Sequence, residues 1–537
     1  MLDELKMYWR FASGLGSFLH NKLSLEEARA IVEKRMAERG ESFLRLVGKG
    51  IFGYDRSPYL PLMKLAGCEL GDLRNMVQAN GLEETLRALR EAGVYISFEE
   101  FKGRKPIERQ GRTIPLSPRA FDNPFLSRYY YVESSGSTGA GARVAHDLEN
   151  LAARTCYDLL SYEALGLLGA STVMWQGELP AGGAINLMLK QVQMGQLAKK
   201  WFTPLRPGDL RPALRFRLAT RAIVLTARLM GAPFPYPRLL RLDQADVVAR
   251  LMAETIQKHG ACLLRAYVSV NLRVSLAAKE LGLDLTGATF IGGGEPATPA
   301  KVAGITSSGA RFVSSYATTE LGAIGISCAH AAHPGDLHFF KDIFALITYP
   351  RRVPNTHVDI DAVHFTTLLP TTPKIMLNVE TDDFGTIETR SCGCLLETYG
   401  FTEHLSDVGS FQKLTGEGMT LVGSDMIRIL EEVLPARFGG SALDYQLEEV
   451  EDEQGLTRLN LIISPKVSIA DESEVIEAWT EALRRGSVGA DLARAYWQQA
   501  GTLRIKRAEP VWSSRGKLMP LLLAGRAARL TDEAEGS

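Results

Sequence analysis

Small hydroxylated residues and glycines form a run from residue 133 to residue 144, Glu-Ser-Ser-Gly-Ser-Thr-Gly-Ala-Gly-Ala-Arg-Val. Glycine lets the backbone approach an anion closely, and the hydroxyl groups add hydrogen-bond donors. The run therefore predicts a phosphate-binding loop, whose candidate residues are Ser134, Ser135, Gly136, Ser137, Thr138, Gly139 and Arg143. A flexible linker has a similar composition, so the run alone leaves both interpretations open.

Four further motifs follow this run along the chain. Residues 290–296 read Phe-Ile-Gly-Gly-Gly-Glu-Pro, residues 315–320 read Ser-Tyr-Ala-Thr-Thr-Glu, residues 381–383 read Thr-Asp-Asp, and residues 514–517 read Ser-Arg-Gly-Lys. Together with the first run, and in this order, they resemble the core motifs of the adenylate-forming superfamily of acyl-CoA ligases, peptide-synthetase adenylation domains and luciferases. Several motifs in order are far more specific than any one of them.

Two other segments refine the resemblance. Residues 57–62, Ser-Pro-Tyr-Leu-Pro-Leu, and residues 335–340, Gly-Asp-Leu-His-Phe-Phe, are similar to the phenylacetate-CoA ligase branch and to the acyl-protein synthetases of bacterial luminescence. The resemblance implies an AMP-forming ligase that activates a small carboxylic acid as its acyl-adenylate, with release of pyrophosphate. It implies ATP and Mg²⁺ as cofactors. The acyl group would then pass to a thiol, on CoA or an acyl carrier protein, or to another nucleophile.

The resemblance also assigns roles to motif residues. Adenylation requires that phosphate charge be neutralised and that the two reactants be held in line. Besides the glycine-serine loop, the implied nucleotide-binding residues are Gly294, Glu295, Pro296, Tyr316 and Asp383. Tyr316 would stack on adenine and Asp383 would bind the ribose hydroxyls. Thr319 would contact phosphate and Glu320 would hold magnesium, while Lys517 would bridge the carboxylate and the α-phosphate as a mobile cation.

Three positions depart from the family pattern. The loop ends on Arg143 where a lysine is usual, and Ala317 replaces a glycine. The Gly-Arg expected at the domain hinge reads either Gly416-Glu417 or Gly423-Ser424. These departures leave two alternatives open: an adenylate-forming enzyme that makes an amide or N-N bond from an unusual acid, and a non-catalytic nucleotide-binding scaffold.

Cysteine and histidine form a second group. Cys392-Gly393-Cys394 places two thiolates within reach of one ion, and Cys328 and three histidines lie in one short segment. Some relatives of phenylacetate-CoA ligase carry structural zinc on similar elements, so the resemblance implies a closed site of Cys328, His338, Cys392 and Cys394, with His333 or His330 as substitutes for His338. Buried thiols and ordinary histidines are the alternative, because the chain has no Cys-x-x-Cys pair.

Two further segments permit two interpretations each. Between residues 206 and 241, eight arginines accompany a single acid, Asp209, and alternate with apolar residues. Such a stretch could bind a membrane surface or an acidic carrier protein, or be a helix with a solvated face. Met174, Trp175 and Gln176 lie where the family often builds its acyl pocket, which would suit an aromatic or long apolar acid, or they belong to the core.

Composition restricts the function further. The chain has 537 residues, of which 45% are hydrophobic and 23% charged, as in an ordinary soluble globular protein. A net charge of -1 argues against nucleic-acid binding. There is no long uncharged apolar run, so no transmembrane segment is expected, and residues 1–6 lack the features of a secretory signal. Six cysteines in so long a chain favour a reducing cytoplasm.

The elements that must position these residues follow from patterning. Residues 1–120 are predicted to be mainly helical, with a capping box at residues 24–27. A strand at residues 129–132 is expected to lead through the phosphate loop into a helix, and residues 288–291 are expected to form a buried strand. Alternating strands and helices predict an α/β fold. A large N-terminal domain, residues 1–413, would hold ATP and acid, and a small mobile α+β domain, residues 414–537, would carry Lys517.

Overall fold

The structure is a computed structural model that describes residues 2–117, 119–133, 143–204, 213–352, 359–410, 413–416, 419–422, 426, 428–484, 488–511 and 521–522. Several of the predicted site residues lie outside this part of the chain: Ser134, Ser135, Gly136, Ser137, Thr138, Gly139 and Lys517. The described chain has a mixed α/β fold, as predicted.

Helices dominate the N-terminal region, as expected. They are α1 (Leu2–His20), α2 (Leu25–Ala37), α3 (Arg39–Val47), α4 (Leu60–Leu65), α5 (Leu70–Asn80), α6 (Leu82–Glu91) and α7 (Phe98–Phe101). The predicted capping box begins α2. The Ser24 hydroxyl accepts from the Glu27 amide at 3.2 Å, and the Glu27 carboxylate accepts from the Ser24 amide at 2.8 Å, which satisfies two otherwise unpaired donors.

One twelve-stranded mixed sheet forms the centre of the molecule. Its parallel half consists of β5 (Ser171–Trp175), β6 (Lys200–Thr203), β7 (Arg238–Leu239), β8 (Cys262–Tyr267), β9 (Ala288–Gly293) and β10 (Arg311–Thr318). Its antiparallel half consists of β11 (Gly322–Ile326), β12 (Leu337–Phe339), β13 (Phe344–Arg352), β14 (Asp359–Thr367), β15 (Val379–Thr389) and β16 (Glu403–Ser410). The halves meet where β10 pairs antiparallel with β11.

Helices cover both faces of the parallel half. They are α8 (Leu148–Ala164), α9 (Gly183–Gln193), α10 (Ala213–Leu229), α11 (Ala245–His259), α12 (Val268–Glu280) and α13 (Pro299–Thr306). Because strand side chains alternate between faces, Leu263 of β8 packs in the core that contains α8, whereas Leu264 packs in the core that contains α11 and α12. The alternation of strands and helices is confirmed, and so is the buried strand at residues 288–291.

The connection into α8 differs from the expectation. A second strand, β4 (Arg143–Asp147), stands between the predicted loop and the helix, and it pairs antiparallel with β3 (Tyr129–Glu133). Asp147 then caps α8 by accepting from the Glu149 amide at 2.8 Å. The glycine-serine run therefore joins two strands of a hairpin.

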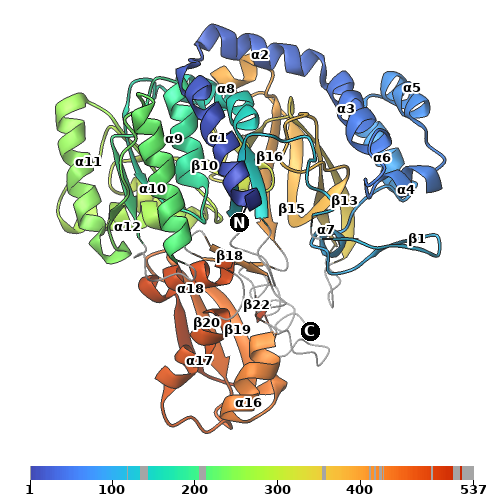
Figure 1. Ribbon diagram of the computed structural model, residues 1–537. Helices are drawn as coiled ribbons and strands as arrows, with labels where there is room; N and C mark the ends of the chain where they lie inside the picture. Colours follow the sequence, from blue (N-terminus) through green and yellow to red (C-terminus); the bar gives the residue numbers. More distant parts are fainter. Residues whose placement is uncertain are drawn as a thin grey trace.

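The C-terminal residues form a smaller unit. Its four-stranded sheet has the order β21 (Leu503–Arg507), β20 (Thr457–Ile463), β19 (Tyr445–Glu451) and β22 (Leu521–Leu522), packed with α16 (Leu434–Phe438), α17 (Glu472–Arg484) and α18 (Val488–Ala500). Figure 1 shows this unit in orange and red below the larger body. The predicted boundary at residues 413/414 falls at the start of β17 (Lys413–Gly416), which pairs with β18 (Met419–Val422). Among the described helices, none has the length and apolar character needed to cross a bilayer.

Candidate active site

A cleft of about 950 Å³ opens at the carboxyl ends of β8, β9 and β10. In open α/β sheets this edge is where ligands bind. Most of the described candidates line it, although they come from separate motifs: Gly294, Glu295, Pro296, Tyr316, Thr319, Glu320 and Asp383. The fold thus brings the three central motifs together in one cavity.

The turn between β10 and β11 carries Thr319 and Glu320. Thr318 Oγ1 accepts from the Leu321 amide at 3.1 Å, and Gly322 has φ +69°, which favours glycine. The buried Arg154 guanidinium donates to the carbonyls of Leu321 and Ala323. Arg154 therefore fixes the turn that positions the predicted phosphate and magnesium ligands. A single arginine in α8 carried no sequence signal for this role.

Glu320 is paired with a lysine that sequence reasoning missed. Lys102, directly after α7, lies with Nζ 2.8 Å from Glu320 Oε1. Burial opposes the charge on Glu320, but the ion pair with Lys102 outweighs burial and lowers the pKa of the carboxyl to about 2. Glu320 is therefore an ionised carboxylate in the cleft, as a magnesium ligand must be.

Tyr316 and Asp383 are also in direct contact. The Tyr316 hydroxyl donates to Asp383 Oδ2 at 2.7 Å, which joins β10 to β15 across the cleft. Burial and the adjacent Asp383 charge raise the pKa of Tyr316 well above its ordinary value. The phenol is therefore a neutral donor that holds the carboxylate in place.

The glycine-rich turn after β9 lies close to β10. A Cβ on Gly293 would come within 2.4 Å of the Ser315 carbonyl oxygen, and Gly294 has φ +81°, so both positions need glycine. Glu295 is buried. Its Oε1 accepts from the Ser269 amide at 2.8 Å and from the Ser269 hydroxyl at 2.6 Å. Its Oε2 lies 3.3 Å from Lys301 Nζ, so both carboxylate oxygens already have protein partners.

Lys301 connects this turn to the smaller unit. The side chain, 2% exposed, donates to Thr457 Oγ1 at 2.8 Å and lies 3.8 Å from Glu451 Oε1. Thr298, at the start of α13, donates to the same Glu451 oxygen at 2.6 Å. The contacts of Glu295 and Lys301 thus link the large sheet to β19 and β20.

Arg143, the last predicted residue of the phosphate loop, begins β4. Its guanidinium carbon lies 4.3 Å from the centre of the Tyr131 ring, an arrangement of cation and aromatic face that is attractive. The structure therefore places Arg143 against β3, next to a loop that lies outside the described residues.

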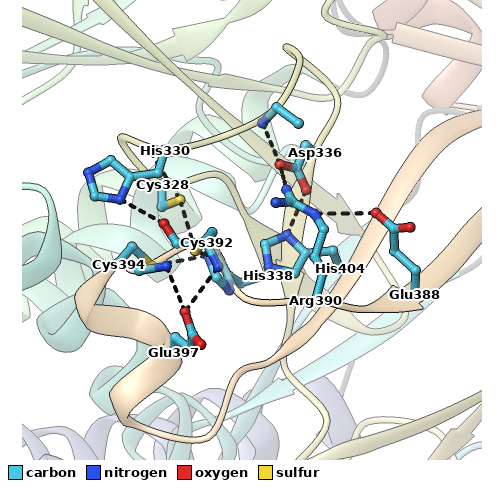
Figure 2. A network of polar contacts seen from close by, with 12 residues as sticks. Cys328, His330, Asp336, His338, Glu388, Arg390, Cys392, Cys394, Glu397 and His404 are labelled. Atoms are coloured by element: carbon cyan, nitrogen blue, oxygen red, sulfur yellow. Dashed lines mark hydrogen bonds and ion pairs between the residues drawn. The ribbon is translucent and has the colours of Figure 1, made fainter.

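The four predicted zinc ligands converge. Their sulfur and nitrogen atoms all lie within 4.8 Å of one another: Cys328, His338, Cys392 and Cys394. His338 Nε2 is 3.6 Å from Cys392 Sγ and 3.2 Å from Cys394 Sγ. Figure 2 shows the cysteines and His338 grouped at one point. His330, one proposed substitute, instead contacts the Cys392 carbonyl through Nδ1 at 3.0 Å, and His333 lines the cleft.

Surrounding groups orient these four side chains. His338 Nδ1 donates to the Phe401 carbonyl at 2.7 Å, which leaves Nε2 free of a proton and directed at the thiols. Glu397 accepts from the Cys392 and Gly393 amides at 3.0 and 2.8 Å and so shapes the Cys-Gly-Cys turn. The hydrogen bond from Cys328 lowers the pKa of the Cys394 thiol, which favours the thiolate that metals bind. Thiolate and imidazole donors fit zinc.

The structure also locates the two segments with open interpretations. The arginine-rich stretch contains α10, on which Leu218, Leu225 and Leu229 are exposed. Docking to a partner or a membrane remains a prediction for this face. Met174 and Trp175 are fully buried in hydrophobic cores, whereas Gln176 lines the cleft.

Comparison with known structures identifies the fold. The chain superposes on a crystal structure of 2-hydroxyisobutyryl-CoA ligase with 2-HIB-AMP and CoA, in the thioesterification state, with a TM-score of 0.57 and 14% identity over 97% of this chain and 94% of that one. The chain has the adenylate-forming ligase fold. An amide bond synthetase from Marinactinospora thermotolerans matches with a TM-score of 0.40 and 14% identity, over 89% of this chain and 93% of that one. No protein-family model and no curated protein sequence matches the chain.

Proposed function

We propose that this adenylate-forming fold activates a small carboxylic acid with ATP and then transfers the acyl group to a thiol. An oxygen of the substrate carboxylate attacks the α-phosphorus, the bond to the β-phosphate breaks, and pyrophosphate leaves. The thiol sulfur then attacks the acyl carbon and AMP leaves. The observation that carries the proposal is the meeting of Tyr316, Glu320 and Asp383 in one cleft. The likeness in fold to 2-hydroxyisobutyryl-CoA ligase supports it.

The proposed roles are those that the resemblance in sequence motifs implies. Tyr316 stacks on adenine, and Asp383, held by the Tyr316 hydroxyl, accepts from the ribose hydroxyls. Thr319 donates to phosphate. Glu320 binds Mg²⁺, which would neutralise phosphate charge. Lys517, outside the described residues, bridges the carboxylate and the α-phosphate when the C-terminal domain, residues 414–537, rotates over the cleft.

The Cys₃His cluster is proposed to hold one structural zinc ion. These four side chains would fill the tetrahedral coordination that zinc prefers, which would leave no position for water or substrate. Such a site contributes folding energy rather than catalysis. All six cysteines are free of disulfides, which supports the cytoplasmic location proposed here.

Pyrophosphate exchange tests the proposal. Purified protein with ATP, Mg²⁺ and labelled pyrophosphate should incorporate label into ATP only when a suitable acid is present. Glu320→Ala should abolish exchange, whereas Glu388→Gln, a change at a half-exposed carboxylate on β15, should not. Exchange without any acid, or no exchange with a broad panel, would contradict adenylation. Mass spectrometry of the product formed with CoA, or with an amine, then separates thioester from amide formation.

A further inference from the structure

Two cations line the cleft without a role in nucleotide binding. Lys190 projects from α9 and Arg265 from β8. Asp158 of α8 forms an ion pair with Lys190, and its other oxygen lies 4.0 Å from Arg265 Nη2. Lys190 and Arg265 are among the residues that line the cleft, whereas Asp158 is not. Asp158 is thus the carboxylate partner of both Lys190 and Arg265, and these three side chains together carry one excess positive charge.

This excess charge is buried. The side chains of Lys190, Asp158 and Arg265 are 12%, 12% and 16% exposed. Arg265 lies in a central parallel strand, beside Met174 and Ile291 in register, where an apolar residue would normally stand. Burial lowers the pKa of Lys190 even though Asp158 opposes the shift. A buried cation without full compensation is costly, and an incoming anion would relieve that cost.

A third donor lies at the same end of the cleft. Tyr130 donates to Asn186 Oδ1 at 2.5 Å, so the Asn186 amide directs its Nδ2 to His146 Nδ1 at 2.9 Å. The His146 proton is then on Nε2, which has no partner among the described residues. His146 is 9% exposed and lines the cleft.

The charge state of His146 agrees with this role. Burial, followed by the charge of Arg154, lowers the pKa of His146 to about 4, so the ring is neutral at pH 7. His146, Glu320 and Lys190 line the same cleft, and the charges of Glu320 and Lys190 both act on the His146 ring. Lys190, Arg265 and His146 therefore present only donors to this part of the cavity.

We propose that the substrate is a dicarboxylic acid, whose second carboxylate is bound by Lys190 and Arg265 with His146 as an additional donor. The inference rests on the proposed function, because the first carboxylate is the one that is adenylated. It differs from the aromatic or long apolar acid considered from sequence: of the three residues named for that pocket, Met174 and Trp175 are buried in the core and Gln176 lines the cleft.

Matched substrates test the inference. Dicarboxylic acids of increasing length are compared in pyrophosphate exchange with their monoamides, which keep the shape and one carboxylate but lose the second charge. The best dicarboxylic acid should exceed its monoamide in kcat/KM by at least about tenfold, the usual value of a charge-assisted hydrogen bond. Lys190→Met should remove this preference, because Asp158 then retains only Arg265 as partner. Lys190→Arg should keep the preference, and Lys199→Met, at an exposed position, should leave it unchanged.

The outcomes separate the two proposals. Equal rates with dicarboxylic acids and monoamides would overturn the inference while adenylation stands. A Lys190→Met variant whose kcat/KM falls equally for the dicarboxylic acid and for its monoamide would also overturn the inference. Lys190 would then bind the reacting carboxylate, which both substrates share. If no acid supports pyrophosphate exchange, the proposed function fails. Thermal shift then tests whether a dicarboxylic acid binds at Lys190. The best-fitting dicarboxylic acid should raise the Tm of the wild-type protein but not of Lys190→Met, and equal shifts would refute the site.

Discussion

The ammonium nitrogen of Lys102 lies 2.8 Å from the Glu320 carboxylate, although 218 residues separate them in the sequence. Their side chains are only 16% and 11% exposed. A positive charge thus already lies beside the carboxylate to which the proposed mechanism assigns magnesium.

Removing Lys102 should destabilise the protein through Glu320. Lys102→Met leaves a buried carboxylate without its partner and should lower the free energy of unfolding by about 3 kcal/mol. The double variant Lys102→Met with Glu320→Gln should recover much of the loss, because the unpaired charge is gone. Urea denaturation without nucleotide measures the free energy of unfolding of both variants. Lys105→Met, at an exposed position, is the control. Equal losses in single and double variants would show that the pair does not stabilise the fold.

Tyr316 and Asp383 should act together on ATP binding. Tyr316→Phe removes the donor that positions Asp383 and should weaken ATP binding by about tenfold. Asp383→Ala should weaken it further, since the ribose would lose its acceptor. Isothermal calorimetry gives the affinities, and Tyr236→Phe, at a half-exposed ring, serves as the control. Native-like affinity in Asp383→Ala would rule out the ribose assignment.

Lys517 should matter for adenylation and not for folding. Lys517→Ala should reduce acid-dependent pyrophosphate exchange by about 10²-fold or more, as expected when a charge aimed at the transition state is lost. Circular dichroism should remain that of the wild-type protein. Lys466→Ala, a 77% exposed lysine of the same unit, is the matched control. Unchanged exchange in Lys517→Ala would remove this residue from the mechanism.

Zinc content and thermal stability should change together. Metal analysis of the purified protein should find about one zinc ion per chain, bound by four protein ligands. Cys392→Ser with Cys394→Ser should lower both the metal content and the Tm, because binding energy is folding energy at such a site. Cys68→Ser, at a cysteine that is not part of the cluster, should change neither. A fully stable wild-type protein that contains no metal would identify these residues as ordinary buried thiols and imidazole.

His146 should make stability depend on pH. Its pKa is about 4 in the folded protein, against an ordinary value of 6.5. Between these values the unfolded chain binds a proton that the folded chain does not, so stability is present above pH 6.5 and is lost as the pH falls towards 4. The slope for this group approaches about 1.4 kcal/mol per pH unit. Urea denaturation at pH 7 and pH 5 should show a smaller difference for His146→Gln than for wild type or His20→Gln. If the stability of wild type and of His146→Gln depends equally on pH, groups other than His146 cause the loss.

The sequence motifs identified those cleft residues that lie together in one short turn. Thr319 and Glu320 share one turn, and Gly293 and Gly294 share another, so their spacing along the chain reports their spacing in the cleft. Lys102 and Arg265 gave no such signal, because each is a single cation in an ordinary segment. Only the tertiary fold sets them beside a carboxylate, and no local pattern records that placement.

The strand β4 was missed for a related reason. Its five residues follow a glycine run and precede a helix cap, and their tendency to be extended becomes visible only when Tyr130 pairs with His146 across the hairpin. The Cys₃His group was predicted from the resemblance, through the Cys392-Gly393-Cys394 pair and the segment from Cys328 to His338, and the structure brings these residues together. His338 was preferred to His330 already from the sequence, and the structure groups His338 with the three cysteines, while His330 contacts the Cys392 carbonyl.

Lys301 would resist the proposed domain rotation. Its ammonium group, buried between Glu295 on one side and Thr457 and Glu451 on the other, must give up the second set of partners before β19 can move. Water has to enter as the contact separates, so the activation barrier would be largely electrostatic. Separation of this buried ion pair would therefore add to the energy that the proposed rotation requires.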